Sequence, residues 1–337
     1  MTHTAAPADI SSSSIDRNAV ADRETPLWGE TRWLCGWSPD NGVGIYIHAG
    51  RYRHDIDFWW VHLAVYLPDG KLAVDRFWCR NEAVAGLVSD TLRFEMTQGG
   101  WTSTYDGVCQ WTDREALTRN ARGCSAPSVR AEWKLSAAEL APEWDMFEGA
   151  SHGQDFATAL HVQGTFSVTG RVRVGDQEYE FNGVGFKDHS AGARNMGAWT
   201  NHRFLIGVLP DLRTVHAVTI IRDGAEPATV GRWHKEGVVE SLTGFEAPLM
   251  TTLVGEPDDQ EIVLRSESET LAIRTEIIHA LPITISQDND NFNGIDWEMD
   301  DDPMVMVESI VRFTAPDGDV GYGFFERSAR RSSLPRP

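Results

Sequence analysis

The chain has 337 residues, a formal net charge of -20 and 41% hydrophobic residues, a globular composition long enough for two moderate domains. This negative charge repels phosphate backbones and anionic lipid, so it argues against nucleic-acid and membrane-surface partners. No apolar run is long enough to span a bilayer, which argues against membrane insertion. The Ala/Ser/Asp-rich residues 1–24 lack a secretory hydrophobic segment, and we expect them to form a disordered tail. The cysteines have no close CxxC spacing and predict free thiols in a cytoplasmic protein: Cys35, Cys79, Cys109 and Cys124.

Pairs of apolar runs joined by short Pro/Asp/Gly turns predict β-hairpins along most of the chain. The first pair is 58–67 and 71–78, and similar pairs follow to residue 325. Helical periodicity is confined to residues 113–122 and 136–140. Because a single antiparallel barrel needs far fewer residues, we expect an all-β fold with two tandem barrels.

The boundary between the two expected barrels is placed in the loop-like stretch that begins at Pro142 and contains glycines. An amino-terminal β-domain would then cover residues 25–155. A carboxy-terminal β-domain would cover residues 156–330 and carry the Asp188-His189-Ser190 motif.

The most informative segment is 181–194, where polar groups that can do chemistry follow an alternating apolar run. Asp188, His189, Ser190 and Arg194 lie within seven residues of one another. Glycines at three nearby positions let the backbone turn sharply or approach other groups closely. Such a cluster at the end of a strand is typical of the mouth of a β-structure.

Residues 161–199 resemble a lipocalin-like family that includes AttH-type proteins, carotenoid 1,2-hydratases and fungal Diels–Alderase-type cyclases. Residues 321–327 are similar to that family's last strand. The sequence departs from the family at Lys187, where Arg is usual, and at Ala191, where Trp is usual. The positions that match are Gly164, Gly170, Tyr179, Gly183, Gly185, Asp188, His189, Ser190, Gly192, Arg194, Trp199 and His202.

The resemblance implies two tandem lipocalin-like barrels with a hydrophobic pocket in one of them or between them. It also implies an isoprenoid or polyketide-like ligand and the absence of a metal or organic cofactor.

Asp188 is the candidate acid. To protonate an alkene its pKa must be raised by burial among aromatic rings, whereas pairing with Arg194 would lower the pKa and make Asp188 structural. Both alternatives are open at this point. His189 or His202 would be its proton partner. Neighbouring residues of a strand point to opposite faces, so Asp188 and His189 share a pocket only if the backbone turns between them.

Further candidates would bind the ligand. Trp199 is expected to form an apolar wall, and the others are Tyr46, Trp60, His62 and Glu326. The histidines lack a recognised ligand spacing, so no metal site is predicted among them. Residues 288–302 mimic part of a calcium loop but have no flanking helices; an acidic solvated loop is favoured over a weak calcium site.

Two functions are compatible with these patterns. The first is a cofactor-independent acid–base enzyme, a hydratase, isomerase or cyclase for an apolar isoprenoid-like molecule. The alternative is a non-catalytic protein that binds or carries a hydrophobic ligand, since a barrel needs only an apolar cavity to do so. Turnover by an Asp188→Asn variant distinguishes the two.

Overall fold

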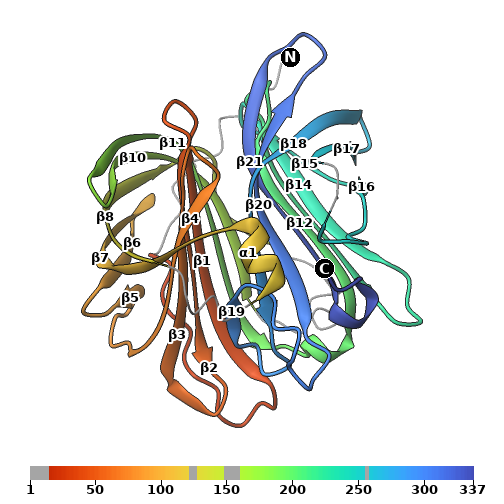
Figure 1. The fold of residues 1–337 in the computed structure, drawn as a ribbon. Helices are drawn as coiled ribbons and strands as arrows, with labels where there is room; N and C mark the ends of the chain where they lie inside the picture. Colours follow the sequence, from red (N-terminus) through yellow and green to blue (C-terminus); the bar gives the residue numbers. More distant parts are fainter. Residues whose placement is uncertain (1–14, 121–126, 148–159, 255–257) are drawn as a thin grey trace.

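The computed structural model describes residues 15–120, 127–147, 160–254 and 258–337, which form two tandem antiparallel β-barrels (Figure 1). The first barrel is an up-and-down ring in which successive long strands pair, and the β1–β11 and β4–β7 pairings close it. Its strands are β1 (Trp28–Ser38), β2 (Val43–Tyr52), β3 (Asp55–Tyr66), β4 (Lys71–Arg80), β5 (Gly86–Val88), β6 (Leu92–Thr97), β7 (Gly100–Asp113), β8 (Ser128–Glu139), β9 (Trp144–Asp145), β10 (Leu160–Val174) and β11 (Gln177–Ala193).

The second barrel repeats this meander, with its last strand, β21, paired to its first, β12. It stays open where β15 ends one side of the sheet and β16 ends the other. Its elements are η2 (Met196–Ala198), β12 (Trp199–Val208), β13 (Thr214–Arg222), β14 (Ala228–Lys235), β15 (Val238–Ser241), β16 (Gly244–Glu246), β17 (Asp259–Arg265), β18 (Thr270–Ile285), β19 (Asn291–Asn293), β20 (Met304–Thr314), β21 (Val320–Arg330) and η3 (Arg331–Ser333).

The strands that face the other barrel are apolar on both sides. In β1, Leu34 enters the interior of the first barrel, whereas its neighbour Trp33 joins a core between the barrels. In the second barrel Phe204 belongs to that shared core and Leu205 to the barrel interior. Strands at the outer surface alternate instead, as the burial pattern of β8 shows. Burial on both faces therefore marks the surface along which the barrels pack.

The change from one sheet to the other falls between Ala193 and Trp199, not at residue 155. Strands β10 and β11, which the sequence assigned to the carboxy-terminal domain, belong to the first barrel. Strand β11 pairs with β1 from Trp28↔Ala193 to Trp37↔Val184. The expected boundary itself lies outside the described residues. The Asp188-His189-Ser190 motif is thus on the closing strand of the first barrel.

Two other expectations are corrected. Residues 136–140 are not helical but complete β8 and its short exit, whereas α1 (Arg114–Arg119) confirms a helix in 113–122, capped by Asp113. Within the expected tail, residues 15–24 contain ordered contacts, and Asn18 donates to the carbonyl groups of Ala83 and Gly86. Residues 1–14 lie outside the described part of the chain.

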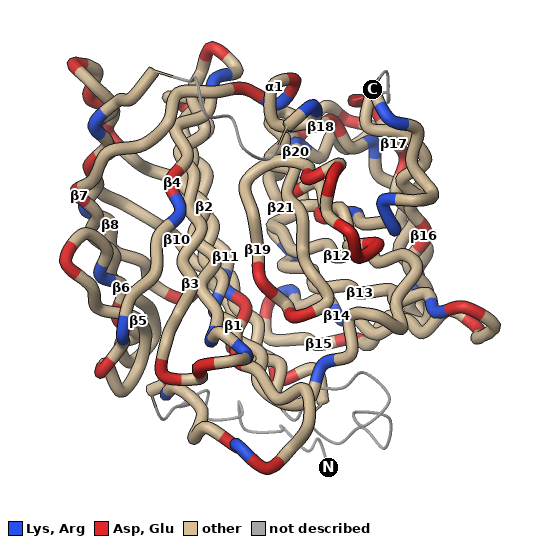
Figure 2. The backbone as a smooth tube through the Cα atoms, turned by 60° about the horizontal axis from the view of Figure 1, so that its bottom comes forward, with Lys and Arg blue, Asp and Glu red and all other residues tan. Residues whose placement is uncertain are grey.

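Charged residues lie mainly at turns and strand ends (Figure 2). Cys35, Cys79 and Cys109 are free thiols, and Cys124 falls outside the description. Within the described ranges, no helix is long and apolar enough to cross a membrane.

Candidate active site

A cavity of about 80 Å³ lies between the two barrels and is lined by strands from both. Side chains from β1, β2, β10 and β11 form one side, and side chains from β12, β13, β18, β20 and β21 form the other. Five of the residues proposed from the sequence meet here: Asp188, Arg194, Trp199, His202 and Glu326.

Asp188 is paired with a histidine of the adjacent strand. His161 Nε2 and Asp188 Oδ2 form a short hydrogen-bonded ion pair, and Gln163 Nε2 donates to the same oxygen at 3.4 Å. Burial alone would raise the pKa of Asp188, but the charge and hydrogen bond of His161, with the charge of Arg194, lower it below its usual value. Asp188 is therefore ionised near neutral pH.

A second carboxylate–histidine pair comes from the second barrel. His202 Nδ1 lies 2.6 Å from Glu326 Oε1. The Trp199 ring stacks on the imidazole with centroids 5.2 Å apart and an interplanar angle of 29°. Trp199 thus packs against the His202 ring and forms part of the cavity wall.

Glu308 is a carboxyl group of a different kind, because no basic side chain pairs with it in the described part of the chain. It is 1% exposed, and the Tyr46 hydroxyl donates to its Oε1 at 3.0 Å. Its Oε2 is buried and accepts no N–H or O–H bond from the described residues, and the carboxyl of Glu326, opposite Glu308 on β21, is within hydrogen-bonding reach of the Glu308 carboxyl. Burial, and then the neighbouring charge of Glu326, raise the pKa of Glu308 well above 4.5. Glu308 is thus held as a neutral acid.

Aromatic rings complete the cavity. Trp33 contacts Phe204 edge-on at 6.0 Å between centroids and Phe324 at 4.5 Å, so rings of both barrels interlock. Beside them, Asn291 Nδ2 donates to His48 Nδ1 at 2.9 Å, and burial lowers the pKa of His48 to about 3. The cavity therefore combines aromatic and aliphatic walls with several polar and ionisable side chains.

The two barrels place their acids at equivalent positions. In the first, Asp188 on the last strand lies opposite Trp33 on the first strand. In the second, Glu326 on the last strand lies opposite Phe204 on the first strand. Glu326 also lies opposite Glu308 on the preceding strand. Both closing seams face the cavity, which explains why residues distant in sequence converge there.

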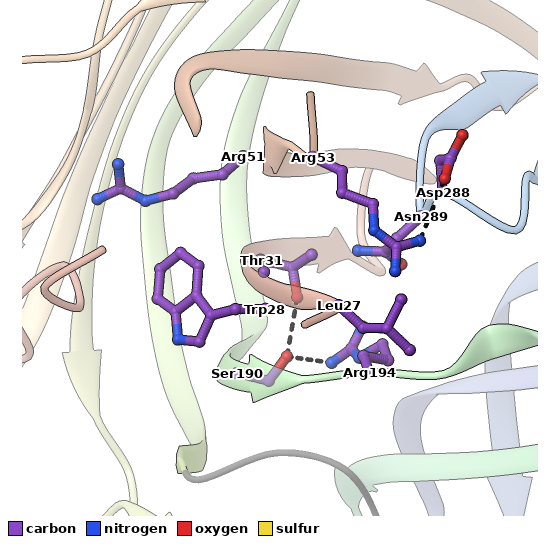
Figure 3. A pocket seen from close by; sticks show the side chains of 10 residues that line it. Leu27, Trp28, Thr31, Arg51, Arg53, Ser190, Arg194, Asp288 and Asn289 are labelled. Carbon is purple, nitrogen blue, oxygen red and sulfur yellow. Dashed lines mark hydrogen bonds and ion pairs between the residues drawn. The ribbon is translucent and has the colours of Figure 1, made fainter. Parts of the chain in front are cut away.

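A small depression with a volume of about 10 Å³ adjoins this cavity, and Figure 3 shows the residues that line the depression. The two hollows share Thr31, Arg194 and Asn289. The Arg194 guanidinium donates to Ser190 Oγ, which is 2.8 Å from Thr31 Oγ1. Arg194 thus stands where the depression meets the cavity.

A family model and several solved structures match this chain. A family model described as a domain of unknown function, DUF7064, matches residues 14–331. The chain belongs to the DUF7064 family. No curated protein matches it in sequence.

Solved structures resemble the DUF7064 chain in fold. An AttH-like protein of Nitrosomonas europaea is 13% identical with a TM-score of 0.61, covering 92% of this chain and 98% of the other. CghA is 9% identical with a TM-score of 0.54, covering 94% and 91%. Kievitone hydratase of Nectria haematococca is 6% identical with a TM-score of 0.51, covering 90% and 89%. These similarities show that the chain shares the fold of these proteins, which is the fold that the sequence resemblance implies.

In the DUF7064 chain His189 does not reach the cavity. Its Nδ1 lies 2.6 Å from Asp16 and its Nε2 3.0 Å from Glu30, inside the mouth of the first barrel. Asp16 also accepts bonds from Arg32 and Lys187, each at 2.9 Å. The alternation of β11 therefore separates Asp188 from His189, as the strand geometry predicts, and His189 belongs to a buried ionic cluster instead.

Three of the proposed ligand-binding residues lie behind the cavity wall. Tyr46 does not line the cavity itself but holds Glu308. The His62 ring packs 5.2 Å from Tyr46, and the Trp60 ring lies 5.1 Å from His48. Trp60 therefore supports the lining residue His48, and His62 supports Tyr46, while neither Trp60 nor His62 lines the cavity.

The acidic loop is not simply solvated, because it ties the second barrel to the first. Asp288 pairs with Arg53 at 3.1 Å and His54 at 3.1 Å, and Asp290 pairs with Arg76 at 2.8 Å. Nowhere in the described ranges do three or more His, Cys, Asp or Glu residues form a group that could hold a metal ion.

Sequence reasoning missed Glu308 and His161. Glu308 is the one acid within the apolar run 304–311, and an ionisable residue at a position of predicted burial was the available signal. His161 begins the segment that resembles the family, but nothing in its spacing indicates its pairing with Asp188.

Proposed function

We propose that this chain is a cofactor-independent acid–base enzyme that acts on a small, largely apolar, isoprenoid-like molecule in the cavity between the barrels. One observation carries the proposal. A neutral acid, Glu308, and an ionised carboxylate, Asp188, line the same aromatic-walled cavity. Groups whose surroundings drive their pKa values apart are suited to opposite roles in proton transfer.

Glu308 is the proton donor in this proposal. In this proposal Oε1 accepts from Tyr46 and the carboxyl proton is on Oε2, and the Glu326 carboxyl, which shares a hydrogen bond with Glu308, is the neighbouring acceptor until a substrate binds. Transfer of this proton to one carbon of a double bond leaves a carboxylate on Glu308 and a cationic centre on the neighbouring carbon. The π-faces of Trp33 and Phe204 would stabilise that centre.

Asp188 is the proton acceptor, a role opposite to the acid role expected from the sequence. Its Oδ2 is occupied by His161 and Gln163, whereas its Oδ1 makes no hydrogen bond in the described part of the chain. Asp188 would remove a proton from carbon in an isomerisation or cyclisation, or from the water that adds in a hydration. One proton leaves Glu308 and one reaches Asp188, so proton exchange with solvent restores both groups.

The named neighbours support an enzyme in this fold. One is a hydratase by name, and CghA has also been solved with Sch210972, so a protein of this architecture holds a small molecule. Their low identity leaves the reaction to be argued from the residues of this chain. A carrier of hydrophobic ligands is the competing function, because an apolar cavity alone would serve it.

The decisive experiment compares Glu308→Gln, Asp188→Asn and wild type. Each is incubated with an apolar metabolite extract of the cells that produce the protein, and masses are followed by liquid chromatography–mass spectrometry. We expect wild type to form a product of equal mass or one water heavier. Glu308→Gln should lose about 100-fold or more of the rate, the usual contribution of a general acid.

Glu261→Gln is the matched control, since Glu261 is exposed on β17, and it should retain the wild-type rate. Full turnover by Glu308→Gln would overturn the assignment of the acid. Retention of one compound by every variant without conversion would establish a carrier.

A further inference from the structure

Arg194 occupies a position through which an extended ligand in the cavity would reach solvent. The cavity volume of about 80 Å³ is below the roughly 300–1,000 Å³ of pockets that enclose a drug-sized ligand. A longer molecule must therefore extend out of the cavity. Arg194, Thr31 and Asn289 line both the cavity and the adjoining depression.

The hydrogen bonds of Arg194 leave most of its donors available. A guanidinium carries five N–H donors in a planar fork that matches a carboxylate. The only hydrogen bond that the Arg194 side chain makes within the described residues is from Nη2 to Ser190 Oγ, and Thr31 fixes that serine from the neighbouring strand (Figure 3). The guanidinium is thus held through Nη2, and its Nε and Nη1 have no protein acceptor among the described residues.

The two other arginines of the depression are already paired. Arg51 Nε contacts Glu30 Oε2 at 2.7 Å, and Arg53 Nη1 contacts Asp288 Oδ1 at 3.1 Å. Arg194 makes no ion pair with any carboxylate of the described residues, because the carboxylates of Asp188 and Glu326 are paired with histidines. Of the three, Arg194 is the one with an unsatisfied charge in the part of the chain that is described.

The acids of the cavity do not neutralise Arg194. Asp188 is paired with His161, Glu326 with His202, and Glu308 is neutral. Burial lowers the pKa of Arg194, and the nearby Asp188 and Glu326 offset this only in part. A half-buried cation without a carboxylate partner is costly to keep out of water. The binding of an anion beside it compensates this cost, so such binding is favourable.

We propose, resting on the acid–base function above, that the substrate is an apolar acid whose anionic oxygen group, a carboxylate, is bound by Arg194. The apolar body of the substrate lies against Trp33 and Phe204, within reach of Glu308. Binding of the acid group where the depression meets the cavity determines which double bond of the substrate lies beside the proton donor, Glu308. Ser190 is a positioning residue in this arrangement, since it acts through Arg194.

The test uses three compounds with one carbon skeleton: geranic acid, methyl geranate and geraniol. Isothermal titration calorimetry at pH 7 measures the affinity of each for the full chain. We expect geranic acid to bind at least 10-fold more tightly than methyl geranate or geraniol. Arg194→Gln should weaken geranic acid binding about 10-fold or more and leave methyl geranate within 2-fold.

Two variants separate this effect from others. Arg171→Gln removes the same charge from an exposed position on β10, and its affinity for geranic acid should remain within 2-fold of wild type. Arg194→Lys keeps the charge without the planar fork, and should keep part of the preference for the acid. Equal affinity of wild type for acid and ester, no binding of either, or an unchanged preference in Arg194→Gln would each overturn the inference.

The binding preference for the acid can be measured whether or not the protein turns any compound over. If Glu308→Gln keeps the preference for geranic acid and wild type forms no product from any compound, the Arg194 site stands and the enzymatic proposal falls. If Glu308→Gln abolishes turnover while acid and ester bind equally well, the enzyme stands and the substrate class falls.

Discussion

Glu308 shows at the level of one residue how a buried acid lowers the stability of a fold. In the folded protein its pKa is raised well above 4.5, whereas in the unfolded chain it is near that value. Above about pH 4.5 the folded state therefore binds more protons than the unfolded state at this position. Stability must then fall as pH rises from 4.5 toward the folded pKa.

Glu308→Gln removes this dependence, because an amide does not ionise and its oxygen can still accept from Tyr46. We predict that the variant becomes progressively more stable than wild type as pH rises from 4.5 to 8. Urea unfolding at a series of pH values measures the difference in free energy of unfolding. Glu261→Gln, at an exposed position, should follow the wild-type curve. Parallel curves for wild type and Glu308→Gln would show that Glu308 ionises in the folded state as readily as in water.

The sequence located much of the site but not the roles of its residues. Asp188, Arg194 and Glu326 could be found because polar residues stood out in strand patterns or in a motif. The role of Asp188 could not, because its pKa depends on His161, which lies 27 positions earlier and is brought beside it by the β10–β11 pairing. Glu308 depends in the same way on Tyr46, which lies in the other barrel.

At the level of elements, the closure of the first barrel depends on close contact between β1 and β11. A Cβ on Gly183 would lie 1.9 Å from the backbone carbonyl oxygen of Trp37 and 2.9 Å from Ser38 Cα, which cannot move without disturbing β1. Gly29 is also in this pair of strands, but nothing lies within 4 Å of its added Cβ. The two glycines thus form a matched pair for testing the closure.

We predict that Gly183→Ala destabilises the protein by about 1–3 kcal/mol, as overpacking does, whereas Gly29→Ala changes stability by less than about 0.5 kcal/mol. Thermal and urea unfolding followed by circular dichroism give both values. Equal effects of the two substitutions would mean that β1 and β11 can move apart at Gly183 without a loss of stability. Their close contact at this position would then not be needed for closure of the barrel.

The hairpins of the chain could be predicted because each has its turn residues between two neighbouring apolar runs. The partner of β11 could not, because β1 lies about 150 positions earlier and its apolar pattern fits several neighbours equally well. The misplaced domain boundary has this cause. Residues 136–140 were mistaken for a helix because a short Ser/Ala run has no strong strand pattern, and pairing with β7 and β10 decided its structure.

At the level of the whole molecule, the two barrels share one of their apolar cores. Trp33 and Tyr46 of the first barrel and Phe204 and Phe324 of the second belong to a single buried cluster. Separation of the barrels would expose these rings to water, and burial of each apolar side chain contributes about 1.5–3 kcal/mol. Neither barrel is therefore complete alone, and we expect the two to unfold together.

Phe313→Ala tests this coupling, because Phe313 is fully buried inside the second barrel and belongs to the core of that barrel, not to the core shared with the first barrel. Its loss should cost about 3–5 kcal/mol. Hydrogen exchange followed by mass spectrometry measures the opening free energy of each barrel separately. We predict that the opening free energy of β8, in the first barrel, falls by the same amount as the free energy of unfolding of the whole protein. Val320→Ala, at an exposed site on β21, should leave β8 unchanged. Unaltered protection of β8 in Phe313→Ala would mean that the barrels unfold independently. In that case either barrel could open while the other stays folded, and the alignment of Glu308 with Asp188 would not be maintained by the fold as a whole.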